Sequence, residues 1–226
     1  FELSGIIGSD NVYIDATGGT YGAAIAGTDI LVSVGGLVLS GSAADNYVLS
    51  SSSASDYVGT INKAELTAAL IGSVSKTYNG STDASLEAEN FQITGKIGVD
   101  NVYIGVTSGS FETANAGTGI GVSVSGLTLS GSAADNYELN TTTLSDNIGV
   151  IEKASLNAAL SGSVSKIYNG NTDASLQAEN FQLTGIIGSD NVYIAARNGT
   201  YASANAGNNI GVSVAELELS GTAADN

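Results

Sequence analysis

The chain has 226 residues, among them 22 acidic and 6 basic ones, and it contains no His, Cys, Met, Trp or Pro. Without His and Cys it lacks the commonest general base, the thiolate metal ligands and any disulfide. A net charge of −16 also opposes binding to nucleic acid or to an anionic membrane, because both attract clusters of Lys and Arg, so we expect neither partner.

The sequence repeats itself at a spacing of 90 residues without insertions or deletions. The motif Gly-x-Asp-Asn-Val-Tyr-Ile and two further motifs carry the register, at residues 8–14, 98–104 and 188–194, at 40–46, 130–136 and 220–226, and at 76–80 and 166–170. We place the repeat boundaries near Lys63 and Lys153. This gives a partial module over 1–63, a complete module over 64–153 and a partial module over 154–226.

Within one repeat, apolar residues alternate with polar or small ones, which predicts half-buried β-strands. In chain order the alternating pairs are Leu66 with Ala68 and Leu70, Phe91 with Ile93, Val102 with Ile104, Val122 with Val124, and Leu127 with Leu129. The alternation slips by one residue across Ser125 and Gly126, as a β-bulge or a strand crossing between two sheets would produce. Frequent Gly and Asn residues limit the strands to about four to eight residues.

Seven or eight short strands per repeat predict an all-β fold of tandem β-sandwich modules of Ig-like size, joined by linkers of three residues or fewer into an elongated rod. A β-solenoid is the competing architecture, although no shorter period is present inside the repeat. Both ends of the chain fall within a module. We therefore expect an excerpt of a longer array or a subunit that its neighbours complete.

Three groups of residues invite a chemical interpretation. Asn79-Gly80 is typical of a type I′ hairpin with Tyr78 packed beside it, whereas a Lys76–Asn79 or Lys166–Asn169 isopeptide bond is the sharper alternative. The carboxylates Glu87 and Glu89 resemble a glycosidase pair on one face of a strand. The recurrent Asp-Asn pairs offer oxygen ligands for a structural Ca²⁺, or close turns with their own backbone; they lie at 10–11, 45–46, 100–101, 135–136, 190–191 and 225–226.

None of these groups has a complete set of catalytic or metal-binding partners in the sequence. We assign no catalytic, cofactor-binding or metal-binding residue and expect no enzyme activity. The aromatic residues Tyr103, Phe111 and Tyr137 recur in every repeat that contains their position, which favours packing in the core or at joints over ligand binding.

The repeat also resembles a known family. The residues that carry the resemblance are the motifs over 75–84, 94–102, 114–119, 122–131, 136–137 and 151–154. They are similar to the YDG repeat and to the related MBG-type repeats of very large bacterial secreted or surface adhesins, including filamentous-haemagglutinin-like exoproteins. Asn79 and Asn169 stand where that motif has its Asp. The resemblance implies a stalk or matrix module of a giant exported protein.

From these observations we expect a structural stalk or fibre segment of an extracellular bacterial adhesin or biofilm-matrix protein. Its partners would be neighbouring repeats, copies of itself, or glycans of a cell surface or matrix. One alternative is a self-polymerising filament subunit joined by β-strand complementation. A second alternative is an array of carbohydrate-binding modules.

Overall fold

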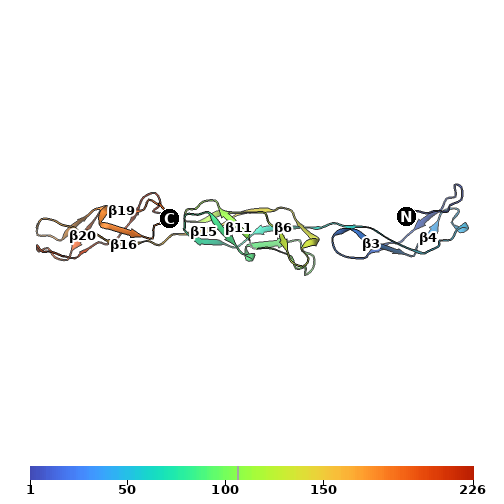
Figure 1. Ribbon diagram of the computed structural model, residues 1–226, viewed down its shortest axis with the longest axis horizontal. Helices are drawn as coiled ribbons and strands as arrows, with labels where there is room; N and C mark the ends of the chain where they lie inside the picture. Colours follow the sequence, from blue (N-terminus) through green and yellow to red (C-terminus); the bar gives the residue numbers. More distant parts are fainter. Residues whose placement is uncertain (106) are drawn as a thin grey trace. The chain divides into compact units, whose positions relative to one another are not determined.

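A computed structural model describes residues 1–105 and 107–226. The chain is all-β, as expected, and Figure 1 draws it as short strands joined by loops. Residues 1–105 and 107–226 contain four 3-10 helices of three residues each: η1 (Ala44–Asn46), η2 (Ala88–Asn90), η3 (Ala134–Asn136) and η4 (Ala178–Asn180). No helix in this part of the chain is long and apolar enough to cross a membrane. The chain divides into two compact units, one formed by residues 1–68, 93–105 and 128–142 and the other by 69–92, 106–127 and 143–226.

The first unit contains four small sheets. Two are antiparallel pairs, β1 (Tyr13–Asp15) with β4 (Val38–Ser40) and β10 (Tyr103–Ile104) with β13 (Leu129–Ser130). One has the order β2 (Gly19–Tyr21), β3 (Gly27–Gly35), β5 (Ser53–Ile61) and is antiparallel throughout. The last has the order β14 (Tyr137–Leu139), β6 (Ala64–Leu70), β9 (Phe91–Thr94), in which β14 and β6 are parallel.

The core of the first unit forms around Leu66, Val102 and Tyr137, which are at most 2% exposed. Ile93, Leu129 and Leu139 pack against this cluster. Leu66, Val102 and Tyr137 are more than thirty positions apart in sequence, so distant segments of the chain each contribute one or two side chains to a shared interior.

The second unit contains a five-stranded sheet that is almost a closed barrel. Its order is β7 (Val74–Thr77), β15 (Thr143–Glu152), β12 (Gly117–Ser125), β11 (Thr107–Phe111), β8 (Asp83–Leu86). The two edge strands β7 and β8 also lie against each other, which curls the sheet around its apolar face. That face buries Val74, Ala84, Leu86, Phe111, Ile120, Val122, Val124 and Ile151, each at most 9% exposed.

Three smaller sheets complete the second unit. They are β16 (Asn157–Leu160) with β18 (Phe181–Thr184), β17 (Asp173–Leu176) with β20 (Arg197–Tyr201) and β21 (Val212–Ser213), and β19 (Tyr193–Ile194) with β22 (Leu219–Ser220), all antiparallel. The pairing of Tyr13 with Ser40 recurs as Tyr103 with Ser130 and Tyr193 with Ser220. Residues at equivalent positions of the sequence repeat thus pair with the same register in all three repeats.

The slip in apolar alternation marks a change of sheet. β12 ends at Ser125, Gly126 adopts a φ of +71°, and the chain then enters β13, which pairs in a different sheet. Of the two explanations for the slip, the strand crossing holds here. Bulges do occur, but within β12, on either side of Ile120.

Two expectations about local structure were wrong. Asn79-Gly80 does not close a type I′ hairpin, because only Gly80 has a positive φ (+76°) and the flanking strands β7 and β8 are opposite edges of the sheet rather than a bonded pair. Tyr103 is not a core residue: it is 50% exposed, like Tyr13 at 52% and Tyr193 at 46%. Phe111 and Tyr137 are each 2% exposed, as expected.

Candidate functional site: the joint between consecutive repeats

Each complete Gly-x-Asp-Asn loop is closed by a tyrosine that follows 37 residues later. The Tyr137 hydroxyl donates to Asp100 Oδ2 at 2.6 Å and accepts from the Ile97 amide at 2.9 Å. Tyr47 repeats this contact in the first repeat, with Asp10 Oδ2 at 2.7 Å and the Ile7 amide at 2.9 Å. The loop can present its carboxylate in this way because it turns tightly at a glycine, Gly98, with a φ of +58°.

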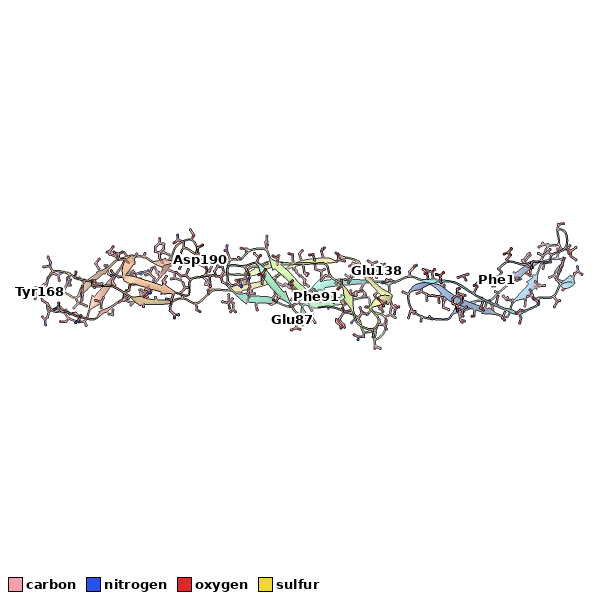
Figure 2. The ribbon with its side chains drawn as sticks, viewed as in Figure 1. Phe1, Glu87, Phe91, Glu138, Tyr168 and Asp190 are labelled. Atoms are coloured by element: carbon pink, nitrogen blue, oxygen red, sulfur yellow. The ribbon has the colours of Figure 1, made fainter. Side chains whose placement is uncertain are left out.

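In the second unit the corresponding carboxylate, Asp190, accepts a hydrogen bond from a tyrosine of a different repeat. The Tyr78 hydroxyl donates to Asp190 Oδ2 at 2.8 Å, and the Tyr78 side chain is only 7% exposed. Tyr78 therefore packs at the joint between the second and third repeats and not beside an Asn-Gly hairpin. The Asp190 position is shown in Figure 2.

The hydrogen bonds to carboxylates also change the acidity of these phenols. The pKa of Tyr137 lies above its ordinary value of 10.0, first because its proton is shared with Asp100 and second because the ring is desolvated. The same causes, with Asp190 as the acceptor, raise the pKa of Tyr78. For Tyr47 the hydrogen bond to Asp10 raises the pKa, while the Ile7 amide opposes the shift. A negative phenolate beside a carboxylate is unfavourable, so the three contacts favour neutral tyrosine.

A second contact joins consecutive repeats twice in the same way. The Ala26 amide donates to Asn136 Oδ1 at 2.8 Å, and the Ala116 amide donates to Asn226 Oδ1 at 3.0 Å. Each pair is separated by 110 residues, so the two contacts occupy equivalent positions. In both contacts a loop amide of one repeat donates to the last asparagine of the motif at 130–136 or 220–226 in the next repeat.

At the joint in the second unit, further contacts surround Asn226. The Ala154 amide donates to the Asn226 carbonyl at 2.7 Å, and a small cavity of about 50 Å³ lies beside it. The lining includes Tyr78, Ala154, Ile187 and Asp190. The joint is thus a small, mixed polar and apolar contact that holds one repeat against the next.

The isopeptide hypothesis can be compared directly with the side chains. Lys76 Nζ donates to Asn79 Oδ1 at 3.1 Å and to both oxygens of Ser81, and it lies 5.2 Å from the centroid of the Phe111 ring. The two residues do meet, but as a hydrogen bond that closes the 78–82 loop. The bond-forming reaction requires a carboxylate beside the lysine. Among the described residues Lys76 forms no ion pair with a carboxylate.

The equivalent lysine of the third repeat has other partners. Lys166 Nζ donates to the backbone and side-chain oxygens of Asn171 and to the Asp173 carbonyl, not to Asn169. A shared Lys–Asn reaction in both repeats therefore has no geometric support.

The carboxylate pair does not lie on a strand. Glu87, labelled in Figure 2, precedes η2 and Glu89 lies within it. Both side chains are exposed. The buried polar residue there is Asn90. Its Oδ1 accepts a hydrogen bond from the Glu87 amide at 2.9 Å, and its Nδ2 donates to the Ser73 carbonyl at 3.3 Å. The structure therefore corrects the sequence interpretation: Glu87 and Glu89 do not form a carboxylate pair on one face of a strand.

The Asp-Asn pairs act mainly in local structure and at joints. Asp10, Asp100 and Asp190 accept hydrogen bonds from tyrosine hydroxyls, and Asn136 and Asn226 accept hydrogen bonds from backbone amides. Over residues 1–105 and 107–226, no group of three or more acidic side chains lies close enough together to hold a metal ion.

Sequence reasoning missed the Tyr–Asp contact and the Asn–Ala joint. A signal for the first was available, because Asp10 and Tyr47 recur together as Asp100 and Tyr137. No comparable signal exists for the second, since the Ala26 and Ala116 amides carry no side-chain information.

The chain matches the family model described as YDG domain three times, over residues 1–54, 62–144 and 152–226. It belongs to the YDG domain family. Neither the curated proteins nor the solved structures compared with this YDG chain include a match.

The family match corrects the wider attribution made from the sequence. The model describes a YDG domain and no adhesin, and the YDG name is also that of the SRA-YDG type of domain, which binds methylcytosine. Membership therefore does not identify MBG-type repeats, filamentous-haemagglutinin-like exoproteins or a bacterial source, and that attribution is withdrawn.

Proposed function

We propose that this chain is a structural segment in which successive YDG repeats, each a sandwich-like module, are placed end to end as an elongated stalk or fibre. One observation carries the proposal: the hydrogen bond between Ala26 and Asn136 is repeated between Ala116 and Asn226. A joint that is used twice with the same atoms supports a regular array rather than a flexible string of independent domains.

The connections between repeats are short enough to support a stiff array. β5 ends at Ile61 and β6 begins at Ala64, so only two residues separate the last strand of one repeat from the first of the next. Such a link cannot act as a flexible coil. Each inter-repeat hydrogen bond contributes about 1 kcal/mol, and the number of such bonds grows with the number of repeats.

An extracellular location is part of the same proposal. The absence of Cys removes unwanted crosslinking during export, and the net charge of −16 keeps neighbouring stalks apart by repulsion. Both features suit a concentrated surface or matrix protein, and neither favours catalysis.

Small-angle X-ray scattering of the 226-residue chain tests the proposal. A compact protein of this length has a radius of gyration of about 17 Å, and we expect a value at least about twice as large with a rod-like distance distribution. The N136A/N226A double variant should broaden that distribution, whereas N46A should not, because Asn46 is exposed at the same position of the first repeat. A compact scattering curve would refute the stalk.

Glycan binding is a second candidate that one observation favours. Tyr13, Tyr103 and Tyr193 occupy the same position in three repeats and each exposes about half of its surface, as a platform for a sugar face would. If these rings stack on sugars, a triple Tyr-to-Ala variant should lose saturable glycan binding, whereas a triple Tyr-to-Phe variant, which keeps the rings, should retain it. That pair of results would support this function over a purely structural one.

Nucleic acid is not an expected partner, although SRA-YDG domains bind methylcytosine. With 6 basic against 22 acidic residues, this chain repels phosphate groups over most of its surface. We expect no shift of a methylated or unmethylated DNA duplex in gel electrophoresis at low salt, and a methylation-dependent shift would replace the stalk proposal by DNA recognition.

A further inference from the structure

The second repeat, over residues 64–152, pairs its first strands with its last strands in parallel. In the first unit, β6 is parallel to β14 over three residue pairs, of which the first sets Ala64 opposite Tyr137. In the second unit, β7 is parallel to β15 over four residue pairs, of which the first sets Val74 opposite Gly149. The strands that begin this repeat are thus bonded directly to the strands that end it.

Each parallel ladder continues by one backbone hydrogen bond beyond its paired residues. The Asn140 amide donates to the Leu66 carbonyl at 3.0 Å, and the Tyr78 amide donates to the Glu152 carbonyl at 2.7 Å. The ladders therefore reach the C-terminal ends of β14 and β15, where the chain leaves these strands.

Parallel pairing decides how the two ladders respond to tension along the chain. Only two residues separate the end of β5 from the start of β6 at Ala64, so tension from the preceding repeat reaches the N-terminal end of β6. Tension from the following repeat reaches the C-terminal end of β15 at Glu152. In a parallel pair, the N-terminal end of one strand and the C-terminal end of the other lie at opposite ends of the ladder. The paired strands are therefore pulled past each other along their length.

The two ladders have to fail together. Residues 71–73 connect β6 to β7, and residues 140–142 connect β14 to β15, so the early strands form one continuous segment and the late strands another. Sliding one segment past the other breaks both ladders and loads all their hydrogen bonds at once. In an antiparallel pair, the two loaded ends lie at the same end of the ladder, and the bonds open one after another.

The late segment is also held from its other side. β15 is antiparallel to β12, and a Cβ added to Gly149 would lie 2.8 Å from Phe111 Cε1 and 2.7 Å from the Ile120 carbonyl oxygen. Only glycine allows so close an approach without a shift of its neighbours. Because β15 is fixed to the sheet in this way, it does not follow β7 under tension, and the load falls on the ladder between them.

Buried side chains shield the ladders from water. Leu66 of β6 and Tyr137 of β14 are 0% and 2% exposed, and Val74 of β7 and Ile151 of β15 are 3% and 2% exposed. A hydrogen bond that is stretched beside such side chains is not readily replaced by one to water, so its loss costs more than the loss of an exposed bond.

We propose that the two parallel ladders form a mechanical clamp, by which the repeat carries tension between its neighbours without unfolding. This inference goes beyond the stalk proposal, because an elongated array need not resist tension. It does not depend on that proposal either, because the ladders lie within one repeat whatever the shape of the whole chain. Scattering tests the shape and force tests the clamp, so one can fail without the other.

The experiment pulls the 226-residue chain in two directions. The chain contains no Cys, so a pair of introduced cysteines defines where the handles attach. Lys63→Cys with Lys153→Cys places the handles just outside β6 and β15 and pulls the ladders along their strands. Ser73→Cys with Asn147→Cys places both handles at the same end of the β7–β15 ladder and peels the two strands apart. All four side chains are exposed, so both variants keep the same packing.

Optical tweezers measure the unfolding force of each variant at one loading rate. For the 63–153 variant we expect a single extension step of about 300 Å, the reach of the unfolded repeat. Its unfolding force should be at least about twofold higher than that of the first event in the 73–147 variant, because forced unfolding follows the barrier and bonds that fail together set a higher one. Equal forces, a lower force for the 63–153 variant, or its gradual extension without a force peak would each overturn the proposal.

Discussion

Asn226 accepts a hydrogen bond from the Ala116 amide across 110 residues, with 3.0 Å between Oδ1 and the nitrogen, and Asn136 does the same for Ala26. The asparagine must be placed by its own repeat to meet a backbone group of the preceding one. The end of η3, where Asn136 lies, provides that placement in the second repeat.

Asn226→Ala should therefore weaken the joint without disturbing the strands. We expect a loss of about 1 kcal/mol in unfolding free energy, the usual net contribution of one hydrogen bond, and faster hydrogen exchange at the Ala116 amide. Asn46→Ala is the matched control, because that side chain is exposed. Unchanged exchange at Ala116 in the Asn226→Ala variant would contradict the contact.

The Tyr–Asp contacts predict loss of stability in alkali. The pKa values of Tyr47, Tyr78 and Tyr137 are raised above 10.0, so the folded state holds these protons more tightly than the unfolded state does. The corresponding stabilisation is complete below about pH 10 and is lost as the pH rises through the raised values. Urea unfolding followed from about pH 8 to pH 11 should show this fall.

Tyr137→Phe provides the control for that titration. It removes both the proton shared with Asp100 and the acceptor for the Ile97 amide, so it should lower stability at neutral pH. It should also make the remaining dependence on alkali shallower. A variant that is destabilised but keeps the full pH dependence would show that the Tyr137 proton is not its source.

Several strand positions were readable from the sequence because the residues of most alternating sets, such as Val122 and Val124, are buried together on one face. Leu66 and Val122, which alternation placed in strands, lie in β6 and β12 and are fully buried. Val102 is also buried, but it lies one residue before β10 and not in a strand. The crossing at Gly126 was also visible, as a slip in the same pattern. Local periodicity reports local burial, and that is what the prediction used.

The joint was not readable, because it depends on groups that periodicity does not distinguish. Tyr78 was assigned to its own turn since Asn79-Gly80 favours a type I′ hairpin, yet the neighbouring repeat holds the ring through Asp190. Here a tertiary contact and the sheet order determine the loop, and turn propensity does not. The exposure of Tyr103 was missed for a related reason, since recurrence in every repeat does not separate core residues from surface ones.

The close approach of Gly149 to Phe111 predicts a position that tolerates no side chain. Gly149→Ala should destabilise the second unit by about 1–3 kcal/mol, because the methyl group has to displace either the ring or the backbone of β12. Gly117→Ala, in β12 itself, is the control: its nearest neighbour would be Ile120 Cδ1 at 3.7 Å, an ordinary contact. Thermal unfolding of the two variants should separate them clearly, and equal stability would disprove the packing.

Glu216 predicts a gain of stability instead. Its φ is +55°, and the same position holds glycine in the other repeats, Gly36 with +67° and Gly126 with +71°. A side chain in this left-handed region costs about 1 kcal/mol, so Glu216→Gly should raise the unfolding free energy by up to about that amount, less the entropy that glycine adds to the unfolded chain. Ala215→Gly, one residue earlier, introduces the same entropy without relieving a positive φ and should lower stability. Urea unfolding that ranks the Glu216→Gly variant at or below the Ala215→Gly variant would show that the left-handed conformation at 216 is not strained.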